Sequence, residues 1–341
     1  MLQQTTVAAV AARYDTFLAR FPDLPALARA RESSVLAAWS GLGYYARARN
    51  LHAAARRIVS AHDGRFPRDP ATLATLPGFG DYMSAAVASL AFGERVPALD
   101  ANVTRVVSRL FAVEGEAGTR SHTELLRRRV AALLPARNPG DLTAALMDLG
   151  QQICTARRPV CPACPVSRFC AARAAGSPER FPRRRAKPRP RRVHLAAAYA
   201  RRDGRMLLAR AEGTLLKGMW LFPAAEADSP RAARSRLSRE LGRVGLRLDG
   251  ELIGETRHTI VHRRLEIRVY RAVAARRSPP FREGAGPPPG TRWLTPSELA
   301  RAAVPTLTRK IAAAAGHPSR TSTTSPLGFP VVPSSGSSPR R

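Results

Sequence analysis

The four cysteines are the most constraining feature of this sequence, because all of them fall within residues 154–170. Their spacing is C-x6-C-x2-C-x5-C, formed by Cys154, Cys161, Cys164 and Cys170. Four thiolates this close can wrap one compact metal centre, and zinc and a cubane iron–sulfur cluster are both chemically suitable. Zinc sites usually pair two short C-x2-C knuckles, whereas only one pair here is short. Disulfides are disfavoured by the clustering, so a reducing compartment is expected.

The formal net charge of +31 indicates a polyanionic partner, and nucleic acid is the first candidate because basic side chains neutralise its phosphates. Residues 1–172 and residues 173–192 each carry a net +8, although the second segment is far shorter. Almost all the positive charge is arginine, as a GC-rich genome would produce. That bias does not explain the excess over Asp and Glu. No apolar run is long enough to span a membrane, and the N-terminus does not form a signal peptide.

Hydrophobic periodicity divides the chain into two folded parts. Residues 1–172 are predicted to be mostly helical, with helices near 7–20, 33–40, 46–61, 82–92, 101–112, 122–134 and 141–152. Residues 173–192, rich in Pro and Arg, are predicted to be a linker, either a solvated tether or a segment laid along DNA phosphates. Residues 193–312 are predicted to form an α+β domain, with strands near 193–200, 205–209, 252–255 and 264–273 and a helix at 230–241. Residues 313–341 are predicted to be disordered.

A hairpin sequence, LPGFG at residues 76–80, lies between two helical stretches. Gly78 and Gly80 let the backbone approach a ligand closely, and amides at a helix N-terminus bind anions such as a DNA phosphate. A lone acid, Asp100, follows about twenty residues on, just before a helix. Taken alone, Asp100 predicts a helix N-cap, a role that is compatible with catalysis.

Three of these features resemble known families. The cysteine spacing resembles the four-iron four-sulfur loop of the endonuclease III superfamily, and the hairpin followed by Asp100 resembles the helix-hairpin-helix glycosylases. Within that superfamily, residues 2–5 (LQQT), 39–51 (WSGLGYYARARNL) and 147–150 (MDLG) resemble the adenine DNA glycosylases of the MutY type. The resemblance implies a mainly α helix-hairpin-helix glycosylase domain with a 4Fe–4S loop in residues 1–172. In it Asp100 is catalytic and the cluster, held by the four cysteines, is mainly structural.

One position separates the members of this superfamily. Bifunctional relatives carry a Lys just after the hairpin, whose amine forms a Schiff base with the sugar and permits strand cleavage. Tyr82 stands there in this chain, and no Lys precedes Lys187. The resemblance therefore implies a monofunctional glycosylase in which Tyr82 assists catalysis. It also implies that Gln4 and Tyr44 fill the gap left by the everted adenine and contact the opposite base.

Hydrolysis of an adenine N-glycosidic bond calls for two acidic groups, because the base leaves protonated and the sugar becomes cation-like. By resemblance Asp100 is the group that stabilises the cation. The general acid of the family is a Glu that would lie two residues before Met1, so the chain of 341 residues is expected to be a weak catalyst unless its start lies further upstream. No residue of the chain is identified as a replacement.

Residues 193–312 resemble the Nudix-like domain of the same family. GMWLFP at residues 218–223 matches a family stretch, and RELGRVGL at 239–246 resembles a Nudix helix without the adjacent glutamates that bind magnesium. Lesion recognition without nucleotide hydrolysis is therefore implied. Residues 257–262 align with the family's recognition loop, in which His262 is retained while Ile260 and Val261 replace a Phe and a Ser. This loss of a hydroxyl predicts weaker discrimination of 8-oxoguanine from guanine.

The predicted function is base excision repair of adenine mispaired with 8-oxoguanine or guanine in double-stranded DNA, by a monomeric, cytoplasmic, nucleoid-associated bacterial protein without a membrane partner. The first alternative is an endonuclease III-like glycosylase with lyase activity, against which the missing Lys argues. The second is a catalytically silent mismatch-binding protein, suggested by the absent Glu. The third, a basic protein that coats nucleic acid, predicts no cofactor.

Overall fold

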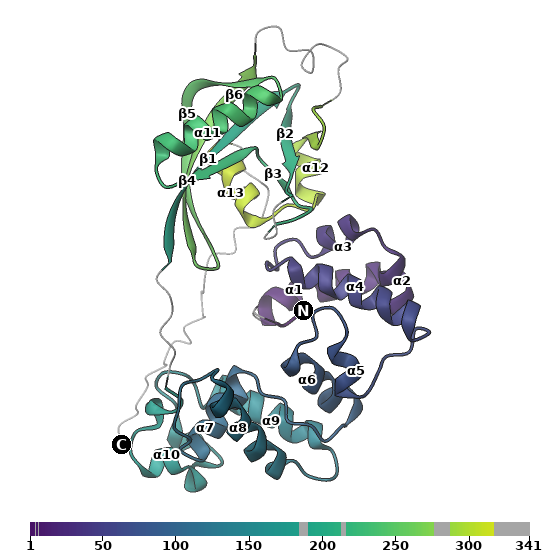
Figure 1. The fold of residues 1–341 in the computed structure, drawn as a ribbon, viewed down its shortest axis with the longest axis vertical. Coiled ribbons are helices and arrows are strands. Elements are labelled where there is room, and N and C mark those ends of the chain that lie inside the picture. The colour runs from purple at the N-terminus through teal and green to yellow at the C-terminus, as the bar shows by residue number, and fades with distance from the viewer. Residues whose placement is uncertain (4, 6, 184–189, 213–215, 276–286, 317–341) are drawn as a thin grey trace, which may run out of the picture.

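The computed structural model describes residues 1–341 except 4, 6, 184–189, 213–215, 276–286 and 317–341. Figure 1 shows a helical region, coloured purple to teal, and a sheet-containing domain, coloured green to yellow. This arrangement confirms the predicted fold class. The helices of the first region are α1 (Val7–Arg20), α2 (Leu24–Arg29), α3 (Glu32–Ala38), α4 (Ala46–Ala61), α5 (Pro70–Ala74), α6 (Asp81–Phe92), α7 (Ala101–Leu110), α8 (Arg120–Leu133), α9 (Pro139–Gln152), η1 (Cys161–Ala163), η2 (Ser167–Phe169), α10 (Ala171–Ala174) and η3 (Pro178–Arg180).

The helical region consists of two groups of helices, α1–α4 and α7–α10, with α5 and α6 between them (Figure 1). Phe17, Leu36 and Trp39 belong to the core of the first group, and a second core joins α7, α8 and α9. A third, smaller core seats α5 and α6 on α4 through Ile58 and Leu73. The hairpin between α5 and α6 is therefore fixed to the buried face of α4. Within the described residues, no helix is both long and apolar enough to cross a bilayer.

The predicted helices are present, and two have the predicted bounds, α1 and α4. Helix α2 was not predicted, because six residues are too few to show helical periodicity. Its start carries local signals nonetheless. Asp23 caps it by accepting a hydrogen bond from Ala26 N at 2.6 Å, and Pro25 lies in its first turn.

The beginning of the segment predicted as a linker is folded against the helical region. Helix α10 and the turn η3 occupy part of residues 173–183, and Phe181 is buried. Arg183 N donates to Gly115 O at 3.0 Å, and Ala117 N donates to Arg183 O at 3.0 Å. The aromatic ring of Phe181 is the physical reason, since its burial outweighs the cost of ordering a charged, proline-rich chain. Residues 184–189 lie outside the described part.

The C-terminal domain is a mixed sheet with helices on both faces. Its strand order is β3-β2-β1-β6-β5, with β4 paired to β1 and β7 paired to β2; only β1 and β6 are parallel. Helix α11 covers one face, while α12 and α13 pack on the other. Its elements are β1 (Arg191–Arg202), β2 (Arg205–Arg210), β3 (Trp220–Leu221), β4 (Ala224–Ala227), α11 (Pro230–Arg243), β5 (Leu246–Ile260), β6 (Arg263–Ala274), β7 (Thr291–Leu294), α12 (Pro296–Arg301) and α13 (Thr306–Ala314).

Several elements of this domain differ from the prediction. Strand β5 is much longer than residues 252–255, because it pairs with β6 along its length through two register shifts. The short strands β3, β4 and β7 were not predicted, since each is held by its neighbours and has no alternating pattern of its own. Helix α13 extends past the boundary predicted at residue 312, and residues 317–341 of the predicted tail lie outside the described part.

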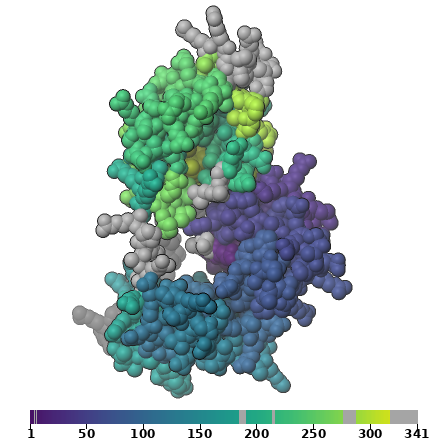
Figure 2. All heavy atoms as spheres, viewed as in Figure 1, coloured from purple at the N-terminus to yellow at the C-terminus, as the bar shows by residue number. Residues whose placement is uncertain are grey.

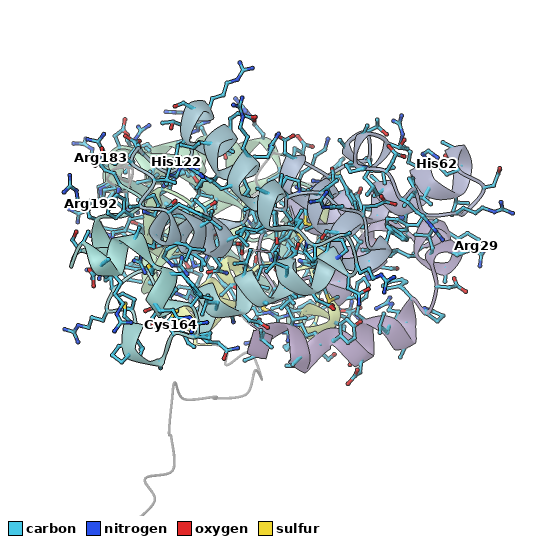
Figure 3. The ribbon with its side chains drawn as sticks, turned by 90° about the horizontal axis from the view of Figure 1, so that it is seen from below. Arg29, His62, His122, Cys164, Arg183 and Arg192 are labelled. Atoms are coloured by element: carbon cyan, nitrogen blue, oxygen red, sulfur yellow. The ribbon has the colours of Figure 1, made fainter. Side chains whose placement is uncertain are left out.

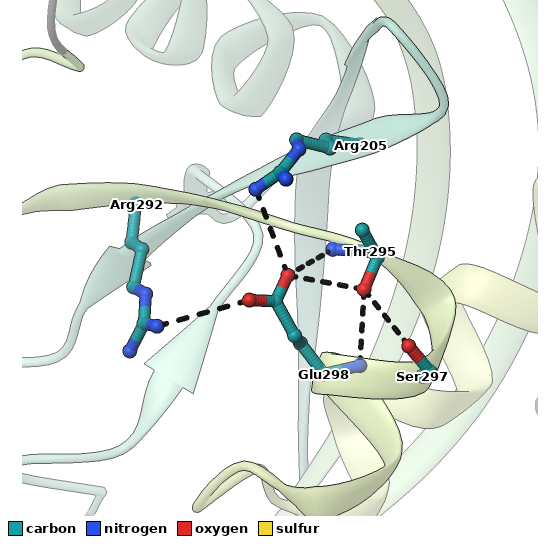
Figure 4. A network of polar contacts seen from close by, with 5 residues as sticks. All are labelled: Arg205, Arg292, Thr295, Ser297 and Glu298. Carbon is teal, nitrogen blue, oxygen red and sulfur yellow. Dashed lines mark hydrogen bonds and ion pairs between the residues drawn. The ribbon is translucent and has the colours of Figure 1, made fainter.

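A polar network fixes the start of α12 (Figure 4). Thr295 Oγ1 accepts a hydrogen bond from Glu298 N at 3.2 Å, and Thr295 N donates to Glu298 Oε2 at 2.8 Å, which completes a capping box. Arg205 on β2 and Arg292 on β7 approach the same carboxylate at 3.8 and 3.9 Å. The hydrogen bond from the Thr295 backbone, the largest cause, lowers the pKa of Glu298 below its ordinary value. The network ties α12 to the sheet edge.

A buried histidine makes the stability of the helical region dependent on pH. His122 on α8 is 3% exposed, and burial lowers its pKa. The unfolded chain therefore takes up a proton near pH 6.5 that the folded chain does not, so the free energy of unfolding falls as pH decreases below that value. We expect His122→Leu to reduce this loss, measured as urea unfolding at pH 7.5 and pH 5.5. His62→Gln, at the half-buried C-cap of α4, is the control for loss of an imidazole. An unchanged pH dependence in His122→Leu would contradict the prediction.

Candidate active site and DNA interface

The predicted hairpin is present between α5 and α6. Gly78 has φ +83°, and a Cβ at this position would lie 2.7 Å from Asn50 Cβ, so only glycine fits. Gly80 is the N-cap of α6 and has no capping side chain, which leaves the first amides of that helix available to a ligand. The ring of Phe79 lies 6.3 Å from that of Phe66, which supports the loop from one side.

Asp100 is the N-cap of α7, as the sequence predicts. Its Oδ1 accepts a hydrogen bond from Val103 N at 2.6 Å, and its Oδ2 accepts one from Asn102 Nδ2 at 3.0 Å. Both carboxylate oxygens are therefore oriented, and the side chain is only partly buried. Tyr82, in the first turn of α6, lies close enough to Asp100 for the carboxylate charge to change its pKa. Burial, the larger cause, and the charge of Asp100 both raise the pKa of Tyr82, so its phenol stays protonated near neutral pH.

A chain of hydrogen bonds connects Asp100 to the cysteine loop. Asn102 Oδ1 accepts from Arg105 Nη2 at 2.8 Å, and Arg105 Nε donates to Cys154 O at 2.6 Å. Gly150 on α9 packs directly on Asn102, because a Cβ at Gly150 would lie 2.6 Å from Asn102 Cβ. Sequence reasoning did not identify Asn102 or Arg105, although their spacing from Asp100 on one helix was visible.

The four cysteines line one cavity and are free of disulfides. Burial, the largest cause, raises the pKa of Cys164, and the charges of the other three cysteines raise it further. Within the described residues, no group of three or more His, Cys, Asp or Glu side chains converges tightly enough to hold a single metal ion. The remaining lining residues of this cavity are Arg109, Ile153, Pro159, Ser167, Arg173 and Pro178.

Arg109 is the buried cation of this cysteine site. It is 2% exposed, and its Nη1 donates to Cys154 Sγ at 3.3 Å and to Thr155 O at 2.7 Å. Its Nε donates to Phe181 O at 3.1 Å, so it also anchors the segment that follows the loop. A buried cation next to four thiolates offsets part of their charge. This residue was missed by sequence reasoning, because nothing local distinguishes it from many surface arginines.

Cys164 and Arg29 mark opposite ends of the helical region in Figure 3. The loop that carries Tyr44 lies between α3 and α4, in the first helix group. The cysteines lie after α9, far away in the sequence. Tyr44 is 53% exposed with φ +46°, and the guanidinium of Arg47 stacks 5.6 Å from its ring centroid. Arg47 also donates to Leu42 O at 3.0 Å and to Gln3 O. Gln4 lies outside the described residues.

His262 lies at the tip of the β5–β6 hairpin, where it is exposed. Its carbonyl accepts a hydrogen bond from Arg191 N at 2.7 Å. The neighbouring Val261 has φ +54° and is 55% exposed. A β-branched residue in this left-handed conformation is strained, so valine is an unfavourable residue at this position of the turn.

The backbone strain at Val261 can be tested by substitution. We expect Val261→Asn to increase the free energy of unfolding by about 1 kcal/mol, because Asn adopts left-handed backbone more readily than a β-branched residue. Val261→Ala removes the β-branch but lacks the short polar side chain that favours left-handed backbone in Asn, so it should gain less. Chemical denaturation of the full chain measures both, and a destabilised Val261→Asn variant would contradict the assignment of strain.

Comparison with known families agrees with this geometry. The model of the HhH-GPD superfamily base excision DNA repair proteins matches residues 1–132, and that of the NUDIX domain matches residues 196–314. Among solved structures, a thermostable thymine-DNA glycosylase is similar over 51% of this chain and 80% of that one, with 29% identity and a TM-score of 0.46. The two family models together place a base excision DNA repair domain and a NUDIX domain in one chain, which is the class of a DNA glycosylase with a Nudix-like domain.

Curated relatives identify the particular family within this class of DNA glycosylases. The adenine DNA glycosylase of Mycolicibacterium smegmatis is 40% identical over 231 residues, which are 67% of this chain and 77% of that protein. Those of Homo sapiens and Mus musculus are each 32% identical over 362 residues; these are 91% of this chain and 66% and 69% of the relatives. The chain belongs to the adenine DNA glycosylase family, whose members are DNA N-glycosylases of base excision repair.

Proposed function

We propose that this chain hydrolyses the N-glycosidic bond of adenine opposite 8-oxoguanine or guanine in duplex DNA, without strand cleavage. The observation that carries the proposal is the Asp100 carboxylate, which two hydrogen bonds orient and whose charge acts on Tyr82 at the start of the helix that follows the hairpin. Family membership supports the choice of adenine. The chain acts as a monomer on the bacterial nucleoid, consistent with its charge of +31.

Each group then has a distinct part in the reaction. The amides that follow Gly78 and Gly80 bind a backbone phosphate and hold the strand while the adenine nucleotide is everted. The Asp100 carboxylate stabilises the positive charge that develops on the deoxyribose as the bond to the base breaks. Tyr82, which stays protonated, can donate a hydrogen bond at the same place. Tyr44, and Gln4 by resemblance, contact the opposite base.

Departure of adenine also needs a proton, and no residue of this chain is assigned as its donor.

The cysteine site is proposed to hold a 4Fe–4S cluster on Cys154, Cys161, Cys164 and Cys170. The donors fit in kind, because four free cysteines line one cavity and the Arg109 guanidinium, bonded to Cys154 Sγ, offsets thiolate charge. When bound, the cluster supplies a covalent cross-link of the loop and no chemistry at the base. Through the contact of Arg105 with Cys154 O, an ordered loop keeps Asn102 and Asp100 in place.

The C-terminal domain is proposed to check the opposite base with the hairpin that carries His262. The exposure of His262 at a strand-to-strand turn supports this role. Because Val261 lacks a hydroxyl, Val261→Ser is expected to increase the preference for 8-oxoguanine over guanine.

Adenine release from duplexes with 8-oxoguanine, guanine or thymine opposite the adenine tests the proposal. Release from the first two duplexes and not from the third is expected. Borohydride added during the reaction distinguishes the lyase alternative, since a Schiff base would be trapped as a covalent protein–DNA adduct. Such an adduct, or mismatch binding without any release of adenine, would overturn the proposal.

A further inference from the structure

The loop that carries Tyr44 contacts the C-terminal domain. Ser40 Oγ donates a hydrogen bond to Val304 O at 2.9 Å, and the Tyr45 hydroxyl donates to the same carbonyl at 3.3 Å. Arg309 Nη2 on α13 donates to Ser40 Oγ at 3.3 Å. Two hydroxyls that flank Tyr44 in sequence are therefore held by one backbone carbonyl of another domain.

The contact between residues 40–45 and the C-terminal domain, called the joint below, is packed like a protein interior. Val304 is fully buried, and Tyr45 is 4% exposed. Met219 from the C-terminal domain is fully buried within the hydrophobic cluster of α1–α4 that includes Leu36. In Figure 2 the C-terminal domain, green to yellow, rests directly on the purple N-terminal helices. Buried contacts with paired polar groups hold two surfaces in one relative position.

The C-terminal side of the joint is rigidly mounted. Trp220 N donates to Ala303 O at 3.0 Å, and Thr308 Oγ1 donates to Trp220 O at 2.9 Å, so the segment before α13 is tied to strand β3. The capping box of Thr295 and Glu298 anchors α12, which leads into this segment, to the sheet edge (Figure 4). The Val304 carbonyl is thus fixed relative to the sheet.

Tyr44, in contrast, needs support from outside. Its left-handed backbone is unfavourable for a residue with a Cβ, and such conformations persist only where the surroundings impose them. Trp39 Nε1 donates to Gly43 O at 3.2 Å and Arg13 Nε donates to Ser40 O at 2.8 Å, so the helical region restrains the loop on one side. The Val304 carbonyl and Arg309 restrain it on the other.

We propose that Val304 and Arg309 are positioning residues that hold Tyr44 in its DNA-binding conformation. The C-terminal domain would then contribute to mismatch recognition through its contact with the loop of Tyr44, independently of the β5–β6 hairpin that carries His262. This inference rests on the proposed function in one respect, namely that Tyr44 contacts the DNA.

The test compares Arg309→Ala with the matched control Arg301→Ala, an exposed arginine of the same domain. Affinity is measured by fluorescence anisotropy for a duplex with adenine opposite 8-oxoguanine and for a fully paired duplex, using the full chain. We expect Arg309→Ala to weaken mismatch binding about tenfold relative to Arg301→Ala, because a charge-assisted hydrogen bond is lost. Binding to the paired duplex should change equally in the two variants, and Arg309→Lys should recover part of the loss.

A double-mutant cycle with Tyr44→Ala separates positioning from a general loss of stability. If Arg309 acts through Tyr44, Arg309→Ala has no further effect in the Tyr44→Ala background. Additive losses, or equal losses on both duplexes, would overturn the inference while leaving the role of Tyr44 intact. If Tyr44→Ala alone leaves mismatch affinity unchanged, the proposed role of Tyr44 is wrong and the inference falls with it.

Discussion

Replacing Asp100 by Asn is expected to slow adenine release by about 10³-fold, the scale of a positioned acid or base group, with little change in DNA affinity. Asn keeps the N-cap of α7, because its side-chain oxygen can still accept the hydrogen bond from Val103 N. What it removes is the negative charge that faces the developing cation on the sugar. Single-turnover release of adenine from a duplex with 8-oxoguanine opposite, using the full chain, measures the rate.

The matched control is Asp23→Asn, because Asp23 caps α2 with the same geometry and lies outside the site. It is expected to retain the full rate. If Asp100→Asn released adenine within about tenfold of the unchanged protein, Asp100 would be a cap and no more, and the mechanism proposed above would be wrong.

Replacing Arg109 by Leu is expected to have the largest effect on stability, a loss of about 3 kcal/mol or more in the free energy of unfolding. Arg109 is buried and donates to Cys154 Sγ, Thr155 O and Phe181 O. Leucine fills part of the volume and leaves these buried and partly buried acceptors without their donor. Chemical denaturation of the full chain, together with iron content after purification, measures the change.

The control for this variant is Arg128→Leu on α8, since the Arg128 side chain is 77% exposed and its partner Glu124 is also exposed. A change within about 0.5 kcal/mol is expected there. Equal stability of the Arg109→Leu and Arg128→Leu variants would show that the cysteine loop does not depend on the buried cation. Loss of iron without loss of stability would separate cluster binding from folding of the loop.

Local signals in the sequence were sufficient for part of the site. Gly78 at a turn that needs positive φ, Asp100 before an amphipathic helix and the cluster of four cysteines each follow from a few neighbouring residues. The bounds of α1 and α4 follow in the same way from helical periodicity. The roles of Tyr82, Tyr44 and His262 came from resemblance and remain proposals.

Other parts could not be predicted, because their partners are distant in the sequence. Arg109 looks like any arginine until Cys154 and Phe181 are brought to it from 45 and 72 residues away. Residues 173–183 have the composition of a linker, yet Phe181 finds a buried place against the helical region. Ser40 and Val304 are separated by 264 positions, and no local pattern relates them.

By itself, the sequence determined the two fold classes, the hairpin, the capping carboxylate and the set of four thiols, because helical periodicity, glycine conformations and cysteine spacing act over short stretches of chain. Only the tertiary structure decided which cation lies beside the thiols, how Asp100 is connected to their loop, and that a carbonyl of the C-terminal domain supports the loop of Tyr44. Those contacts depend on packing between segments far apart in the chain, where burial selects one partner among many chemically similar ones.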